Sequence, residues 1–153
     1  MVRPDNPRSV YLDSNCLIYA VTDRPGSEPI KEILHRAQAN KLSVVISPIS
    51  YVEVRGWGRS DPYPKELDEQ VIAILDHPAL TRVEFNRRVA LAARRVAHAY
   101  PLKNWDAMHL ASAIEGGVDV FMTADSDFRR GEFFDGVWVD EPYIPGDQPL
   151  TGL

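Results

Sequence analysis

The chain has very little cysteine: Cys16 is the one cysteine among 153 residues. An intrachain disulfide and a zinc site built from several cysteines are therefore excluded. No apolar run approaches the roughly 20 residues that a membrane-spanning helix needs, and the first residues carry no signal-peptide core. We therefore expect a cytoplasmic protein that does not span a membrane, in which Cys16 is a small core residue.

Positive charge is also scarce. The sequence holds 17 lysines and arginines against 22 aspartates and glutamates, which gives a formal net charge of −5. This balance argues against a protein that holds nucleic acid through a basic surface alone. Divalent cations bound to acidic residues would offset much of the charge and would attract a phosphate-bearing substrate locally.

Several catalytic motifs are missing as well. The sequence has neither a G-x-S-x-G nucleophile elbow nor a phosphate-binding P-loop, so serine hydrolases and nucleotide kinases lack their signatures. His35, His77 and His98 lie on separate segments. His109 follows Asp106 by three positions, but no third soft ligand stands near, which disfavours tetrahedral zinc.

Short apolar runs alternate with helical stripes along the chain. Strands are predicted at 10–12, 43–46, 80–85, 118–123 and 136–139, and helices after 14 and at 30–37, 48–54, 67–75, 86–100 and 105–115. This alternation predicts an α/β fold with a mainly parallel central sheet flanked by helices. We expect one domain over residues 1–153, with an irregular tail at about 140–153.

One loop is unusually aromatic. Residues 56–64 break every periodicity and must form a loop, yet they include a tryptophan and a tyrosine. Such a loop either packs against its own side chains or forms a rim for RNA bases or a partner chain. The sequence does not separate these readings.

Four acids stand close to predicted strand ends or helix starts: Asp13, Glu53, Asp106 and Asp125. In a parallel sheet such positions can meet at the carboxyl edge, where open α/β sheets bind their ligands. Four carboxylates in one cleft repel each other unless cations are bound. Oxygen ligands suit Mg²⁺ or Mn²⁺, and a pair of such ions about 4 Å apart can clamp a phosphodiester and activate a water.

Each acid also has an ordinary structural explanation. Asp13 could simply cap a helix, and Glu53 could be an exposed helix-former. Asp106 could complement a helix dipole, while Asp125 and Asp127 could make a turn. The coincidence of all four is what favours a functional site.

The same residues carry a resemblance to a known family. The segments 11–15, Ser47 with Glu53, 106–113 and 123–128 resemble the PIN-domain nucleases in order and spacing, over roughly residues 9 to 139. The closest likeness is to the VapC-type ribonuclease toxins of toxin–antitoxin pairs. The last two segments are the more specific. Ser14 stands where the family commonly has threonine, which keeps a hydroxyl beside the acids.

The resemblance implies a metal-dependent endoribonuclease in which water attacks the phosphodiester and leaves 5′-phosphate and 3′-hydroxyl ends. It implies Mg²⁺ or Mn²⁺ as the cofactor. Asp13 and Asp106 would be the foremost ligands, followed by Glu53 and Asp125, with Asp127 as an extra ligand through water.

Partners follow from the same resemblance. It implies an RNA substrate, a small antitoxin protein that inserts a segment into a groove, and a homodimer. Apolar stripes at Ile30–Ala37 and Leu67–Leu75 are candidate protein contacts, although core packing explains them equally well. The arginines that could contact the RNA backbone are Arg55, Arg59, Arg129 and Arg130.

Two other classes remain open at this point. A small-molecule phosphohydrolase would use Asp13 as a nucleophile at a strand end. A PIN-like module could instead bind RNA or protein without cutting, although its acids are intact.

Overall fold

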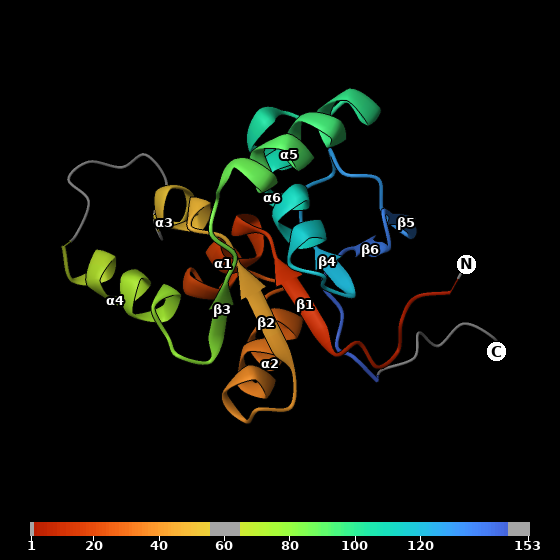
Figure 1. Cartoon of the computed structure of the whole chain (residues 1–153). Helices are drawn as coiled ribbons and strands as arrows, with labels where there is room; N and C mark the ends of the chain where they lie inside the picture. Colours follow the sequence, from red (N-terminus) through yellow and green to blue (C-terminus); the bar gives the residue numbers. More distant parts are fainter. Residues whose placement is uncertain (1, 56–64, 147–153) are drawn as a thin grey trace.

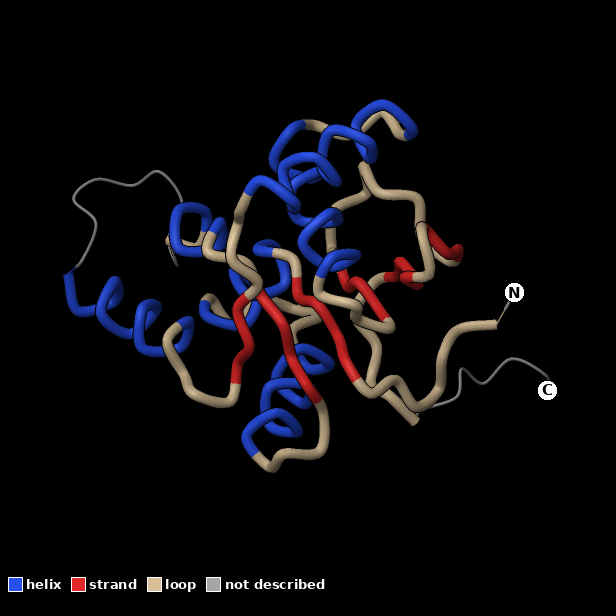
Figure 2. Tube along the Cα trace, in the orientation of Figure 1, coloured by secondary structure: helices blue, strands red, loops and turns tan. Residues whose placement is uncertain are grey.

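The computed structural model describes residues 2–55 and 65–146. Within these ranges a six-stranded sheet is covered by helices on both faces (Figure 1; Figure 2). The strands are β1 Ser9–Leu12, β2 Ser43–Ile46, β3 Leu80–Arg82, β4 Val120–Met122, β5 Glu132–Phe134 and β6 Val137–Asp140. The helices are α1 Ser14–Val21, α2 Glu28–Gln38, α3 Ile49–Glu53, α4 Lys65–Leu75, α5 Arg87–Ala99 and α6 Asn104–Glu115.

The strand order places β1 and β4 side by side in the middle of the sheet. The order is β3-β2-β1-β4-β6-β5, and every pair is parallel except β5 with β6. The chain moves outward from β1 through β2 to β3 and then returns to place β4 on the other side of β1. This reversal of strand order is the point at which open α/β sheets bind ligands, outside the carboxyl ends of the strands.

Side chains alternate between two cores, one on each face of the sheet. Val10 and Leu12 of β1 pack with apolar residues of α1, α2 and α4. Tyr11, between them, faces the opposite core, which is formed with α5 and α6. Cys16 is fully buried in the first core, and burial raises the pKa of its thiol, so it is the core residue that the sequence predicted.

The predicted α/β fold with a mainly parallel sheet is confirmed, with two corrections to its strands. The strand expected at 80–85 ends at Arg82, because the chain beyond Val83 turns away to the Asn86 cap of α5. Strand β5 was not predicted. It forms a hairpin with β6 through Asp135 and Gly136, which both have positive φ. An Asp-Gly pair with two positive φ values is typical of a two-residue hairpin turn.

Some sequence predictions fall outside the described residues. These are the aromatic loop at 56–64, with Arg59, and the last part of the predicted tail, 147–153. Residues 141–146 contain no helix or strand, whereas Asp140, at the start of the predicted tail, ends β6. Tyr143 is buried, and its hydroxyl donates to the carbonyl of Pro4 at 2.7 Å. In the part of the chain that the structure describes, no helix has the length and apolar character needed to cross a membrane.

The start of α5 offers a test of the fold away from any functional residue. The Asn86 side chain accepts a hydrogen bond from the Val89 backbone N–H at 3.1 Å and so caps the helix. We expect Asn86→Ala to lower the free energy of unfolding by about 1 kcal/mol, as loss of an N-cap does. Urea unfolding measures this change, and an unchanged midpoint would contradict the assigned cap.

Candidate active site

Asp13 joins the ends of the two central strands. It follows β1 and caps α1, its backbone N–H donates to the Met122 carbonyl of β4, and its side chain is buried. Oδ1 accepts from the Ser14 N–H at 2.7 Å, and Oδ2 accepts from the Thr123 hydroxyl at 2.8 Å. Burial raises the pKa of Asp13, although His109 and these hydrogen bonds oppose the rise. The predicted position at a strand end beside a helix start is confirmed, so Asp13 is both a cap and a member of the acidic group.

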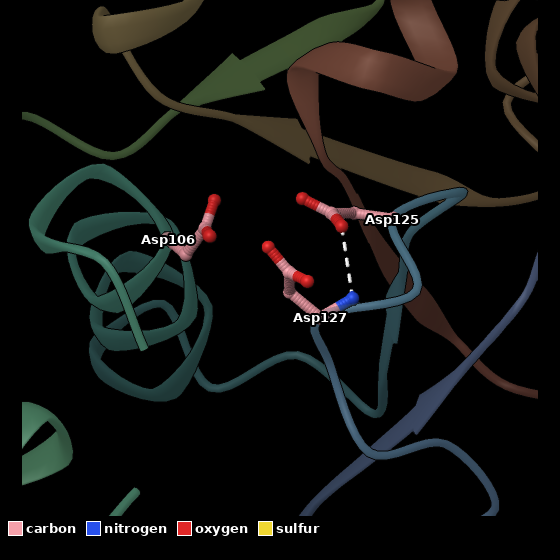
Figure 3. A group of neighbouring side chains, drawn as sticks. All are labelled: Asp106, Asp125 and Asp127. Carbon is pink, nitrogen blue, oxygen red and sulfur yellow. Dashed lines mark hydrogen bonds between the residues drawn. The ribbon is translucent and has the colours of Figure 1, made fainter. Parts of the chain in front are cut away.

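Three further aspartates gather at the same edge of the sheet (Figure 3). Asp106 lies in the first turn of α6, while Asp125 and Asp127 follow β4. One carboxylate oxygen from each lies within 4.8 Å of the others. The Asp127 N–H donates to Asp125 Oδ1 at 2.9 Å, and the Asp125 N–H donates to the Thr123 hydroxyl at 3.0 Å, so the loop after β4 is held in place.

The electrostatics of Asp106 connect this trio to Asp13. Burial raises the pKa of Asp106 to about 6, and the negative charges of Asp125 and Asp13 add to the rise. Lys103 pairs with Asp127 at 3.6 Å, but both side chains are largely exposed. His109 lowers the pKa of Asp106 and so offsets part of this effect, but the net shift remains upward.

Glu53 completes the acidic group from the end of α3. Its Oε1 accepts hydrogen bonds from the Ser14 hydroxyl at 3.0 Å and from His109 Nε2 at 2.5 Å. Burial acts to raise the pKa of Glu53, but the hydrogen bond and charge of His109, with Ser14, outweigh it, so the pKa lies below its ordinary value. The contacts with His109 and Ser14 therefore favour the ionised form of Glu53.

His109 belongs to the site, although the sequence indicates it only as a disfavoured zinc ligand. It is 1% exposed, and its Nε2 lies 3.7 Å from Asp13 Oδ1 as well as against Glu53. Asp106 and His109 are three positions apart on a helix, so they lie on one side of α6. That spacing was the available signal for a shared role at the acidic edge.

Buried polar side chains continue beneath the acids. The Tyr11 hydroxyl lies 2.6 Å from His109 Nδ1, and the Ser14 hydroxyl lies 3.0 Å from that of Ser50. Burial, followed by the charge of Asp13, raises the pKa of Tyr11 well above its ordinary value, so the phenol keeps its proton. A connected layer of hydroxyl and imidazole groups therefore supports the carboxylates from the core side.

Two of the arginines that the sequence suggested for contact with the RNA backbone are paired with acids of the protein itself. Arg129 pairs with Glu132 at 3.9 Å and Arg130 with Glu141 at 3.5 Å. Arg55 is exposed two residues beyond Glu53, where its Nε donates to the Val52 carbonyl. Of the three that the structure describes, Arg55 is the one without an ion pair to a described acid.

The donor set fits a hard divalent cation. In residues 2–55 and 65–146, the one group of candidate metal ligands consists of Asp106, Asp125 and Asp127, which supply oxygen alone. Carboxylate oxygens suit Mg²⁺ and Mn²⁺, whereas zinc favours nitrogen and sulfur. Burial, followed by the charges of Asp125 and Asp13, raises the pKa of Asp106, and a bound cation would offset the unfavourable charge.

The family follows from a comparison of the sequence with known families. The sequence pattern of the PIN domain matches residues 10–133. The chain belongs to the PIN domain family. The match runs from Val10 in β1 to Phe133 in β5 and includes every acid of the site. No curated protein matches the chain.

Solved structures agree with the PIN fold. The chain is similar to one in the crystal structure of VapBC2 from Rickettsia felis bound to a DNA fragment from their promoter, with 18% identity, a TM-score of 0.62 and coverage of 87% of this chain and 98% of that chain. A chain of a toxin–antitoxin complex from Klebsiella pneumoniae is 22% identical, with a TM-score of 0.62 and coverage of 88% of this chain and 98% of that chain. A chain of DNA-bound VapBC from Salmonella typhimurium is 20% identical, with a TM-score of 0.61 and coverage of 87% of this chain and 97% of that chain.

The cost of ionising Asp106, caused first by burial and then by the neighbouring carboxylates, can be tested without any assay of function. Because its folded pKa of about 6 lies above the ordinary 3.8, ionisation of Asp106 costs stability as pH rises through 6, and the cost disappears below about pH 4. We expect Asp106→Asn to raise the free energy of unfolding at pH 8 in EDTA by about 1 kcal/mol, a value discounted for the half-exposed side chain.

Urea unfolding of both proteins at pH 8 and at pH 4 measures the difference in their free energies of unfolding, which should be present at pH 8 and absent at pH 4. A saturating concentration of Mn²⁺ should reverse the order of stabilities at pH 8, because a bound ion stabilises the wild-type fold. A destabilised Asp106→Asn protein at pH 8 in EDTA would contradict the assigned cost of ionising Asp106.

Proposed function

We propose that the protein is a metal-dependent endoribonuclease and the toxin of a toxin–antitoxin pair. The observation that carries the proposal is the convergence of Asp106, Asp125 and Asp127 at one edge of the sheet. The charge of Asp13 acts on Asp106, and Glu53 is joined to Asp13 through His109. Membership of the PIN domain family supports it. The structural neighbours, whose titles name VapBC and toxin–antitoxin complexes, support the toxin role.

The acids divide into a direct and an indirect group for holding Mg²⁺ or Mn²⁺. Asp13, Asp106 and Asp125 are the proposed direct ligands, joined by Glu53, while Asp127 is exposed enough to act through water. When bound, such a cation polarises a phosphate oxygen and lowers the pKa of an attacking water. Attack on phosphorus with departure of the 3′ oxygen leaves 5′-phosphate and 3′-hydroxyl ends.

The chain itself contributes orientation and charge. Thr123 and the Ser14 N–H hold both oxygens of Asp13, and the Thr123 hydroxyl also accepts from the Asp125 N–H. These contacts fix two acids on neighbouring strand ends before substrate arrives, and preorganised charge is what a phosphoryl-transfer site requires. No side-chain nucleophile is needed.

Cleavage of RNA tests the proposal directly. Wild-type protein should cut a mixed-sequence RNA with Mn²⁺ or Mg²⁺ and should stop in EDTA. Asp106→Asn should lower the rate at least about a hundredfold, as loss of a charge-stabilising group does. Asp135→Asn is the matched control: the same chemical change in the exposed β5–β6 turn, where asparagine tolerates the positive φ.

Equal cleavage by wild type and Asp106→Asn would remove Asp106 from the mechanism. Tight RNA binding without metal-dependent turnover would replace the nuclease with a binding module. A phosphate trapped covalently on Asp13 would instead favour the small-molecule phosphohydrolase. Sequencing of the 5′ ends formed in cells would identify the RNA that is cut.

An antitoxin segment has a candidate docking place. Ile30, Ile33 and Ala37 of α2 are buried in the core. Leu34 of α2 and Ile74 of α4 are half-buried and line an apolar cavity of about 180 Å³, which α1 also borders. This cavity suits an apolar side chain of a partner protein. The two helices proposed from the sequence therefore meet at one groove, although most of their stripes serve the core.

The proposed homodimer has its own test. Light scattering of the purified protein should give twice the chain mass of 17.2 kDa. A monomer that persists at high protein concentration would contradict the dimer while leaving the nuclease proposal intact.

A further inference from the structure

A buried histidine faces the acids, and the proposed hydrolysis gives it no direct part. His109 is 1% exposed on α6, with Nε2 at 2.5 Å from Glu53 Oε1 and 3.7 Å from Asp13 Oδ1. Its other nitrogen, Nδ1, lies 2.6 Å from the Tyr11 hydroxyl. The ring therefore bridges the core side of the sheet and the acidic edge.

The contact with Glu53 has a fixed direction. An ionised carboxylate only accepts hydrogen bonds, so Nε2 carries a proton and donates it. The Ser14 hydroxyl donates to the same oxygen, Oε1, and neither donor uses Oε2. Two donors on Oε1 set the rotation of the carboxylate and leave Oε2 available to another partner.

Tyr11 holds the imidazole ring from behind. Its own ring lies edge-on to that of His109, with centroids 5.8 Å apart at 68°, and is stacked on Phe121 with centroids 5.3 Å apart. The Tyr11 hydroxyl can donate to Nδ1 of a neutral ring or accept from Nδ1–H of a charged ring, so it orients His109 in either state. The aromatic core thus fixes the direction of the Nε2–H bond.

Packing alone does not account for this arrangement. A buried polar group costs free energy unless it is hydrogen-bonded, and an apolar side chain of similar shape can replace a bonded pair at little cost. Glu53, by contrast, ends a helix of five residues, and its side chain is 32% exposed. Its long side chain needs an external constraint to keep one orientation.

We propose that His109, oriented by Tyr11, is a positioning residue that fixes the Glu53 carboxylate for cation binding by the acidic group. The inference rests on the proposed function, because it deepens the role of the same site. Partners that orient metal ligands typically change metal affinity by about 10- to 100-fold when they are removed.

Mn²⁺ binding to the full-length protein without RNA tests this role. Isothermal titration calorimetry should show that His109→Leu weakens binding by about 10- to 100-fold. His109→Gln should recover most of the loss, because its amide N–H can occupy the place of Nε2–H. Tyr11→Phe should give a smaller loss in the same direction. Tyr143→Phe is the matched control, since it removes another buried hydroxyl, which bonds to Pro4 instead.

A double-mutant cycle separates positioning from general structural support. If His109 acts through Glu53, adding His109→Leu to Glu53→Gln causes no further loss of Mn²⁺ affinity. Additive losses, or wild-type affinity in a folded His109→Leu protein, would overturn the proposal. So would a failure of His109→Gln to bind better than His109→Leu. Circular dichroism verifies folding, and if His109→Leu does not fold, equal Mn²⁺ affinity of Tyr11→Phe and Tyr143→Phe overturns the proposal.

The results of this experiment can contradict the positioning role of His109 and the proposed nuclease function independently of each other. A wild-type protein that binds Mn²⁺ but leaves RNA intact would contradict the nuclease, while the affinity series would still decide the role of His109. A nuclease whose Mn²⁺ affinity is indifferent to His109 and Tyr11 would contradict the positioning role alone.

Discussion

Repulsion between carboxylates is the constraint on which the site depends. Two unit negative charges 4.8 Å apart repel by about 3.5 kcal/mol at an effective dielectric of about 20, and by more when they are closer. Asp106, Asp125 and Asp127 contain three pairs of carboxylates within this distance. Exposure of Asp127 and a raised pKa at Asp106 reduce this cost without removing it. This cost is appreciable against a typical stability of about 5–15 kcal/mol, which is why a bound cation would stabilise the arrangement.

The fold provides the rigidity that holds these charges together. Asp13 and the Asp125 loop extend from neighbouring parallel strands whose register is fixed by Leu12 opposite Met122. Thr123 ties the two ends together through Asp13 Oδ2 and the Asp125 N–H. On the core side, Tyr11, Ser14 and His109 replace apolar packing with hydrogen bonds that reach the acids. The polar layer therefore runs from Tyr11 of the central strand β1 to the acidic edge.

The sequence was sufficient for the parts of the molecule that follow from periodicity and topology. Buried apolar runs and amphipathic stripes predicted the parallel sheet, and the position of Asp13 between a strand and a helix was correct. The sequence alone was insufficient where the structure depends on contacts between segments that lie far apart along the chain. The Tyr11–His109–Glu53 chain joins residues 98 and 56 positions apart, which no local pattern reveals. The β5 hairpin was missed although its Asp135-Gly136 turn was visible, because a strand of three residues has too little periodicity to stand out.

The central claim is that this acidic edge is built to hold a divalent cation. Anomalous diffraction from crystals grown with Mn²⁺ tests it most directly. The account predicts a strong peak among the carboxylates of Asp13, Asp106 and Asp125, with Glu53 turned toward it. Crystals with bound Mn²⁺ at other positions and no peak among these carboxylates would contradict it.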